Sequence, residues 1–299
     1  MLMLGAGSVL AGTGAAALHG NLEILAAILC MLFAMFAQLS SGFYHRYYDA
    51  IYNYGEFFAV SGRKGDDSPA ELAGLLKAGG TAMFLIAATV GLAIFGLAGW
   101  WTLLIGAVAF FIAWINNSGP CPLFRTPYGM AVPFILFGPL GVVGTMMVQA
   151  DVTPGDVWQF YYFMPGIAVG IAAGFLAANV QLVLGFMHYD RDVDNCKDTF
   201  VVRHGKRAAV SLIVFNGAMA FVSVGAYVFL YDERSPVMMI FPGLIAFAGS
   251  VSTALLMRYD RREVNGLIMQ LSLWNMLIFG VLILVAGVAL GDADRMGMP

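Results

Sequence analysis

The chain has 299 residues, of which 60% are hydrophobic and only 11% are charged, with a formal net charge of −3. Soluble domains carry about 25% charged residues, so this chain has too few charges to cover a surface that faces water. The composition excludes a soluble globular domain, a disordered chain and a nucleic-acid-binding protein, and it predicts an all-α, polytopic membrane protein.

Nine apolar segments have roughly the length that a helix needs to cross a bilayer. In chain order they are residues 2–18, 22–44, 80–98, 100–116, 131–149, 161–187, 208–230, 237–257 and 266–290. The first segment is short, but it lacks the basic region of a signal peptide and more apolar segments follow at once. We therefore expect it to be a spanning helix rather than a cleaved leader, within a single domain over residues 1–299.

The basic residues are distributed unevenly between the two sides of this arrangement. All Lys and Arg residues except Arg234 and Arg295 fall in connections that follow even-numbered segments. Cytoplasmic loops of membrane proteins are enriched in Lys and Arg. The pattern predicts a multi-pass protein of the cell inner (plasma) membrane, with nine transmembrane helices and its N-terminus in the cytoplasm.

Two of the predicted cytoplasmic loops are much longer than the others, and they cover residues 45–79 and 188–207. Within the first, residues 68–71 read Ser-Pro-Ala-Glu, a helix-capping pattern with proline at the first helical position. It predicts a short amphipathic helix over residues 69–77, separate from the third spanning segment.

The second long loop holds an acidic cluster. On a helix, Asp190, Asp194 and Asp198 would share one face, where like charges repel each other. A divalent cation can neutralise such a cluster, and Mg²⁺ binds one or two carboxylates together with phosphate oxygens. With Arg191 and Lys197 beside it, the cluster favours a metal-bridged diphosphate site. The alternative is an acidic loop that is simply solvated.

Two further polar stretches lie on the same predicted side. His45, Asp49 and Asn53 would share one helical face at the end of the second segment, where a belt of interfacial tyrosines is the alternative reading. Arg125 and Tyr128 lie in a loop rich in proline and glycine, and they could reach a phosphate or a second substrate. The alternative there is an ordinary turn.

These stretches resemble the UbiA superfamily of membrane prenyltransferases, and within it the 1,4-dihydroxy-2-naphthoate polyprenyltransferases of menaquinone synthesis. The family has nine spans, with one Asp-rich motif after helix two and another after helix six. The resemblance is carried by residues 38–49, 118–149, 189–205 and 263–278.

The resemblance implies a transferase that moves a prenyl group from a polyprenyl diphosphate to an aromatic acid in the lipid bilayer, with Mg²⁺ as cofactor. It implies catalytic roles for Asp49, Asp190 and Asp194, with metal binding by these three and Asp198. It also implies substrate-binding residues, which are His45, Arg46, Asn53, Arg125, Tyr128, Arg191 and Lys197.

The chain departs from the family pattern in both motifs. In the first, His45, Arg46 and Asn53 replace family Asn and Asp residues, so only Asp49 keeps its acid, and Arg46 could contact diphosphate directly. The second motif is about one helical turn shorter, and an ungapped alignment would place His188, Asp190 and Asp192 in its acidic positions. These departures leave two alternatives open: a family member that binds prenyl lipid or quinone without catalysis, and an enzyme with another aromatic acceptor.

Overall fold

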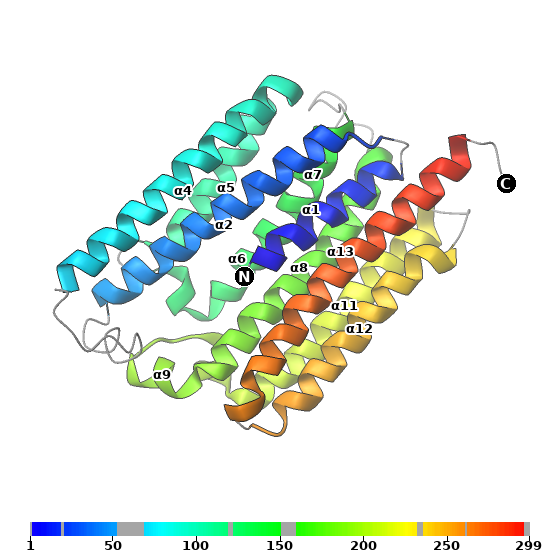
Figure 1. Cartoon of the computed structure of the whole chain (residues 1–299). Coiled ribbons are helices and arrows are strands. Elements are labelled where there is room, and N and C mark those ends of the chain that lie inside the picture. Colours follow the sequence, from blue (N-terminus) through cyan, green and yellow to red (C-terminus); the bar gives the residue numbers. More distant parts are fainter. Residues whose placement is uncertain are drawn as a thin grey trace.

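The computed structural model describes residues 2–18, 21–52, 69–118, 122–150, 160–231, 236–260 and 262–295. These residues form long helices that run side by side, joined by short helical turns (Figure 1). The long helices are α1 (Leu2–Ala17), α2 (Ile24–Tyr52), α4 (Pro69–Ala98), α5 (Trp101–Asn117), α8 (Phe160–Met187), α11 (Lys206–Tyr231), α12 (Pro236–Met257) and α13 (Asn265–Arg295). The shorter elements are η1 (Leu123–Arg125), η2 (Pro127–Met130), α6 (Ala131–Ile135), η3 (Leu136–Leu140), α7 (Gly141–Ala150), α9 (Tyr189–Asp194), α10 (Phe200–His204) and η5 (Arg262–Val264).

Seven of the described helical segments are long and apolar enough to cross a membrane. They include one built from several short elements, Pro127–Gln149. α1 and α5 are apolar but shorter. The predicted all-α, membrane-embedded class is therefore confirmed, whereas the count of nine spans and their orientation stay predictions.

Glycine residues allow α1 and α13 to approach each other closely. A Cβ added to Gly7 would lie 2.8 Å from the carbonyl oxygen of Met276, and one added to Gly14 would lie 2.5 Å from that of Ile283. Cβ atoms at Gly280 and Gly287 would likewise fall on backbone atoms of α1. Most of α1 is buried, so this short helix forms part of the centre of the bundle.

The helix predicted over residues 69–77 is not a separate element, and this part of the prediction is wrong. α4 starts at Pro69, as the capping pattern indicates, but continues unbroken through Gly79 and Gly80 to Ala98. The two glycines lie against the rings of Phe43 and Tyr44 of α2, and Ser40 Oγ donates to the Gly80 carbonyl (2.8 Å). The glycine pair therefore serves close helix packing rather than a helix break.

The segment between α5 and α8 consists of several short helical elements with a kink between them. Gly138 has non-helical backbone angles next to Pro139, within the π-helical turn η3. A Cβ at Gly138 would lie 2.6 Å from the Cα of Gly174, so α8 crosses closest there. On the same segment, η2 also packs beside α8.

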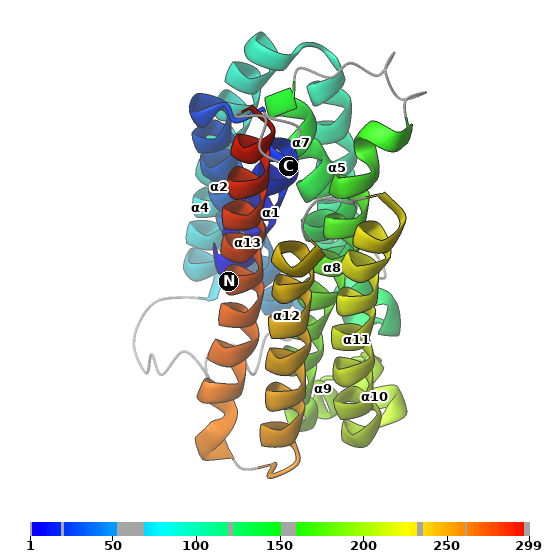
Figure 2. The same ribbon diagram turned by 90° about the vertical axis from the view of Figure 1, so that its right-hand side faces the viewer.

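The predicted functional stretches gather at one end of the bundle. Figure 2 shows α9 and α10 at the same end as the connection between α12 and α13. The C-terminal end of α2 also lies there (Figure 1).

Candidate active site

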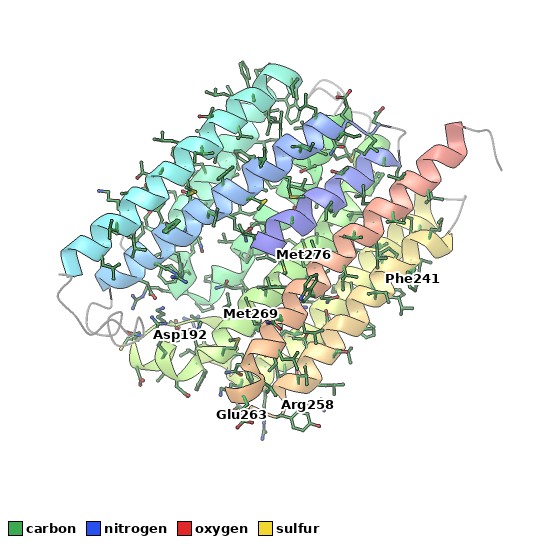
Figure 3. The ribbon with its side chains drawn as sticks, in the orientation of Figure 1. Asp192, Phe241, Arg258, Glu263, Met269 and Met276 are labelled. Atoms are coloured by element: carbon green, nitrogen blue, oxygen red, sulfur yellow. The ribbon has the colours of Figure 1, made fainter. Side chains whose placement is uncertain are left out.

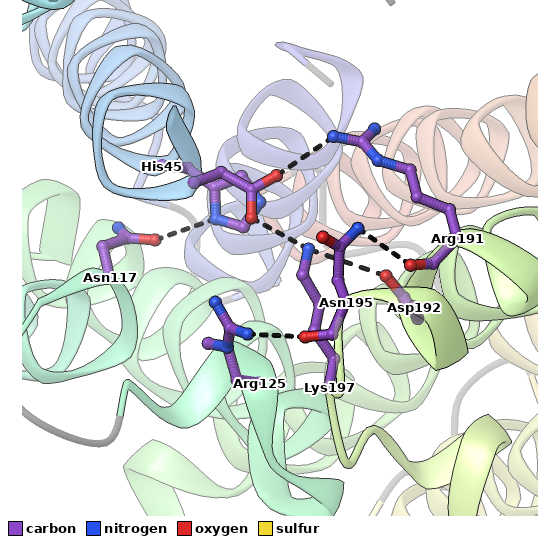
Figure 4. Close-up of polar contacts among 8 residues, drawn as sticks. His45, Asn117, Arg125, Arg191, Asp192, Asn195 and Lys197 are labelled. Carbon is purple, nitrogen blue, oxygen red and sulfur yellow. Dashed lines mark hydrogen bonds and ion pairs between the residues drawn. The ribbon is translucent and has the colours of Figure 1, made fainter. Parts of the chain in front are cut away.

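Asp49, near the C-terminal end of α2, is held by two basic side chains from the segment after α8. Figure 4 shows these two, Arg191 and Lys197, on the same side of the site. Lys197 Nζ lies 2.9 Å from Asp49 Oδ1, and Arg191 Nη2 lies 3.4 Å from Asp49 Oδ2. The Asp49 side chain is only 13% exposed. The structure thus brings together residues from the two motifs that the sequence singles out, 148 positions apart along the chain.

Lys197 also approaches a second acid. Its Nζ lies 3.6 Å from Asp192 Oδ1, and the exposed fractions of the two side chains are 7% and 9%. The same ammonium lies 5.3 Å from the centre of the Phe124 ring. Because a buried charge is costly unless it is paired, the three charged groups stabilise one another and form a cluster of opposite charges. We call Asp49, Asp192 and Lys197 the charge triad.

The turn at the end of α9 sets the direction of Lys197. The Lys197 N–H donates to the Asp192 carbonyl (2.9 Å), and the Cys196 N–H donates to that of Val193 (3.0 Å). Cys196 has φ +51°, a left-handed conformation. This is the Schellman pattern of a helix end, and it reverses the chain so that Lys197 lies beside Asp192.

Arg125 forms hydrogen bonds that connect its own loop, between α5 and α6, to the segment after α9. Its Nη2 donates to the Asn195 carbonyl (2.8 Å), while its own carbonyl accepts from the N–H of Asp198 (2.9 Å). Asn195 Nδ2 in turn donates to the Arg191 carbonyl (2.8 Å). Arg125 therefore holds the segment that carries Arg191 and Lys197.

His45 is bound to α5. Because Asn117 Oδ1 can only accept, His45 Nδ1 is the donor of the 3.2 Å bond between them. Asn117 Nδ2 then donates to Ser41 Oγ (3.0 Å). The imidazole also packs edge-on against Phe124, with ring centres 4.4 Å apart. These contacts fix the imidazole one helical turn from Asp49.

Of the three acids predicted to share a helix face, Asp190 and Asp194 lie on α9, and Asp198 does not. α9 ends at Asp194, and the left-handed turn at Cys196 separates Asp198 from it. The side chains of Asp190, Asp194 and Asp198 are exposed, and Asp198 pairs with Arg203. The assumption of a continuous helix over residues 190–198 is therefore wrong. The metal-binding role of the three acids stays a prediction.

Two predicted substrate-binding side chains, Arg46 and Tyr128, are exposed, the latter to 69%. Asn53 lies outside the described residues.

Sequence reasoning gave no role to Asn117, which carries the contact to His45, and it placed Asp192 at the site only in the ungapped alignment. The ungapped alignment was the sequence feature that could have identified Asp192 as a site residue. For Asn117 that feature was its position at the start of the loop that contains Arg125 and Tyr128.

Burial shapes the electrostatics of the second motif. Desolvation raises the pKa of Asp192, against the opposing effect of Lys197. Desolvation also lowers the pKa of His188, although the charge of Asp192 opposes this. Burial therefore opposes the charged forms of both groups, and Lys197 is the main influence that counteracts this effect at Asp192.

The donor set is compatible with a cation bound between two acids. Asp49 and Asp192 converge on one positive centre, the Lys197 ammonium. Within the described parts of the chain, no cluster of three or more His, Cys, Asp or Glu side chains could hold a metal ion by itself. Mg²⁺ commonly takes few protein carboxylates and completes its shell with phosphate oxygens and water. The residues thus fit Mg²⁺ that arrives together with a diphosphate.

The fold matches that of known helical membrane proteins. It superposes on a UbiA homologue from Aeropyrum pernix K1 with a TM-score of 0.68 at 17% identity, covering 95% of this chain and 98% of that one. For a UbiA homologue from Archaeoglobus fulgidus the TM-score is 0.64 at 18% identity, with coverage of 97% and 96%. The latter protein is also known bound to GPP and Mg²⁺, and that structure has a TM-score of 0.59 at 18% identity with 98% of both chains covered. The chain therefore has the UbiA fold.

Sequence comparison identifies relatives that share one name. The chain is 24% identical over 221 residues to 1,4-dihydroxy-2-naphthoate octaprenyltransferase of Bacillus subtilis (strain 168), covering 72% of this chain and 67% of that protein. It is 27% identical over 222 residues to the protein of that name from Mycobacterium tuberculosis, with coverage of 74% and 72%. No family model matches the chain. Fold and relatives together confirm the predicted resemblance to UbiA-superfamily prenyltransferases, and the relatives carry the name of the predicted branch.

Proposed function

We propose that this chain is a Mg²⁺-dependent prenyltransferase that moves a polyprenyl group from polyprenyl diphosphate to 1,4-dihydroxy-2-naphthoate, as a step of menaquinone biosynthesis. The observation that carries the proposal is the charge triad, which joins the two motif-bearing ends of α2 and α8 within a UbiA fold. The names of the curated relatives support the acceptor, and the A. fulgidus protein bound to GPP and Mg²⁺ supports the donor and the cofactor.

The basic residues of the site suit a diphosphate. Arg191 and Lys197 lie side by side at Asp49, where their N–H groups can donate to phosphate oxygens as charge builds on the leaving group. Arg125 keeps both in place through the Asn195 carbonyl. Asp49 and Asp192 would help to hold Mg²⁺, which would supply further positive charge against the leaving diphosphate.

The proposed reaction balances as an alkylation. The allylic carbon–oxygen bond breaks, and the diphosphate leaves with the electron pair. The allylic cation forms a carbon–carbon bond with the electron-rich ring, at the position that carries the carboxylate. Loss of CO₂ returns an electron pair to the ring. The apolar helices around the site exclude water, which would otherwise capture the cation.

The remaining site residues belong to the same proposal. Asp190, Asp194 and Asp198 are proposed metal ligands on the exposed side of the segment after α8. His45, Arg46, Asn53 and Tyr128 are proposed substrate contacts. We also propose that this end of the bundle faces the cytoplasm in the cell inner membrane, because all Lys and Arg residues except Arg234 and Arg295 fall in the predicted connections on that side.

One observation favours a second candidate, a family member that binds prenyl diphosphate without transferring the prenyl group. Lys197 and Arg191 already engage Asp49, so a metal must compete with two cations.

The test is prenyl transfer from a radiolabelled polyprenyl diphosphate by the purified protein in nanodiscs. Dihydroxynaphthoate is supplied in one arm and 4-hydroxybenzoate in another, each with Mg²⁺ or with EDTA. We expect EDTA-sensitive product with the naphthoate. Binding of the labelled diphosphate without product from either acceptor would support the second candidate, and product from hydroxybenzoate alone would reassign the acceptor.

A further inference from the structure

A pocket lies outside the candidate active site, between the ends of three helices. Its volume is about 530 Å³, and none of the site residues lines it. The residues that line it come from the end of α8, the start of α11 and the end of α12. They are Phe186, Lys206, Arg207, Val210, Ser211, Met257, Arg258 and Asp260. Figure 3 shows Arg258 at the end of the bundle where Asp192 also lies.

The rim of this pocket is strongly basic. Lys206, Arg207 and Arg258 face a single carboxylate among the described lining residues, Asp260, so the pocket has a net charge of +2. Asp260 is already engaged by Lys206, with Nζ–O distances of 2.8 and 2.9 Å. Neither Arg207 nor Arg258 makes an ion pair with any residue that the structure describes. Two guanidinium groups are thus available to an anion.

The floor of the pocket is apolar. Phe186 and Met257 are buried there, and the Lys206 ammonium lies 5.0 Å from the centre of the Phe186 ring. One N-terminal helix end, that of α11, and two C-terminal ends, those of α8 and α12, meet at the pocket, so their opposite potentials offset one another. The basic side chains therefore supply its positive charge.

We propose that this pocket binds the phosphate-bearing headgroup of an anionic phospholipid. Basic pockets between membrane helices are suited to anionic headgroups. The buried apolar floor favours a lipid over free phosphate, because a lipid can place acyl carbon against it while the phosphate reaches the two arginines. The site is separate from the charge triad, so this proposal stands or falls independently of the prenyltransferase assignment.

The test is native mass spectrometry of the delipidated full-length protein with palmitoyl-oleoyl phosphatidylglycerol or the matching phosphatidylcholine. We expect the wild type to prefer the anionic lipid, and the Arg207→Gln/Arg258→Gln protein to lose about tenfold or more of that affinity. The double Arg→Lys protein should keep most of the preference. Lys77→Gln removes an exposed cation of α4 outside the pocket and should have no effect.

A second variant should act in the opposite direction. Asp260→Asn removes the carboxylate and releases Lys206, so affinity for the anionic lipid should rise. Asn tolerates the left-handed conformation of Asp260 (φ +42°), so the turn should keep its shape. Equal binding of both lipids, or Arg→Gln effects no larger than that of Lys77→Gln, would overturn the proposal. Displacement of the anionic lipid by millimolar inorganic phosphate would also overturn it, in favour of a free-phosphate site.

Discussion

Lys197 is the residue on which the candidate active site depends most directly. Its ammonium lies between two acids on different helices, and all three side chains are largely buried. The Lys197 ammonium offsets the repulsion between the carboxylates of Asp49 and Asp192. A metal ion bound between paired carboxylates has the same effect. Asp49 is the one acid that the first motif contributes here, so a metal at this position meets few negative charges and one resident cation.

Replacing Lys197 should expose this role. Lys197→Met leaves Asp49 and Asp192 without their shared cation, and we expect a loss of about 3 kcal/mol in unfolding free energy. Added Mg²⁺ should then raise the melting temperature of the variant more than that of the wild type. Thermal denaturation in detergent, with Mg²⁺ or EDTA, measures both effects.

Lys206→Met is the matched control, since Lys206 pairs with an exposed acid and its loss should cost about 1 kcal/mol or less. Equal losses in the two variants, or equal responses to Mg²⁺, would contradict the assigned role of Lys197.

Asp192 should give the folded protein a characteristic pH dependence. Because burial raises its pKa, the folded state binds the proton more tightly than the unfolded chain does. Its stabilising contribution is therefore complete below the ordinary pKa of 3.8 and is lost as the pH rises through the raised pKa. Relative to Asp192→Asn, the wild type should gain stability as the pH falls from 7 to 4.5. Melting curves in EDTA over this range test the sign, and a wild type that loses stability relative to the variant would refute it.

At the scale of elements, the end of α9 decides which acids meet. The spacing of Asp190, Asp194 and Asp198 predicts one acidic face only if the helix continues, but the helix stops at Asp194. The left-handed residue at this helix end is Cys196, where glycine is more usual. Such a stop is hard to predict without a glycine, and it is the reason that Asp192 and Lys197, rather than the evenly spaced acids, meet Asp49.

Cys196 therefore offers a direct test of this turn. Cys196→Gly relieves the left-handed conformation and should leave stability equal or higher by up to about 1 kcal/mol. Cys196→Val places a β-branched residue there and should lower stability by about 1–3 kcal/mol. Chemical denaturation of the two variants measures the difference. If valine were tolerated as well as glycine, the turn would not be what positions Lys197.

At the scale of the whole molecule, the apolar segments predicted each long helix that the described residues form, because length and hydropathy are local properties. The sequence also placed the polar motifs at one end of the bundle. The sequence could not show that α4 runs unbroken from Pro69, because Gly79 and Gly80 are typical of a helix break. Only the structure shows that these glycines make room for the rings of two α2 residues, Phe43 and Tyr44. The partners of His45 and Asp49 likewise depend on packing between helices distant in sequence.

The glycine contacts between α1 and α13 should be a main source of bundle stability. Gly280→Ala would place its Cβ on the backbone of Gly7 and should destabilise the protein by about 1–3 kcal/mol. Gly225→Ala in α11 meets nothing within 4 Å, so it should be neutral or stabilising by about 0.5–1 kcal/mol. Comparison of the two melting temperatures tests this. Equal effects would mean that α1 and α13 are not held by close backbone approach.

The central claim is that acids from both motifs act together on a prenyl diphosphate, and the most direct measurement is kcat/KM for prenyl transfer in single-acid variants. We expect Asp49→Asn and Asp192→Asn each to lower it by about 100-fold or more, while Glu23→Gln, an exposed acid outside the site, leaves it unchanged. Asp190→Ala and Asp194→Ala report on the proposed exposed ligands in the same assay. Wild-type rates in both Asp49→Asn and Asp192→Asn would contradict the account.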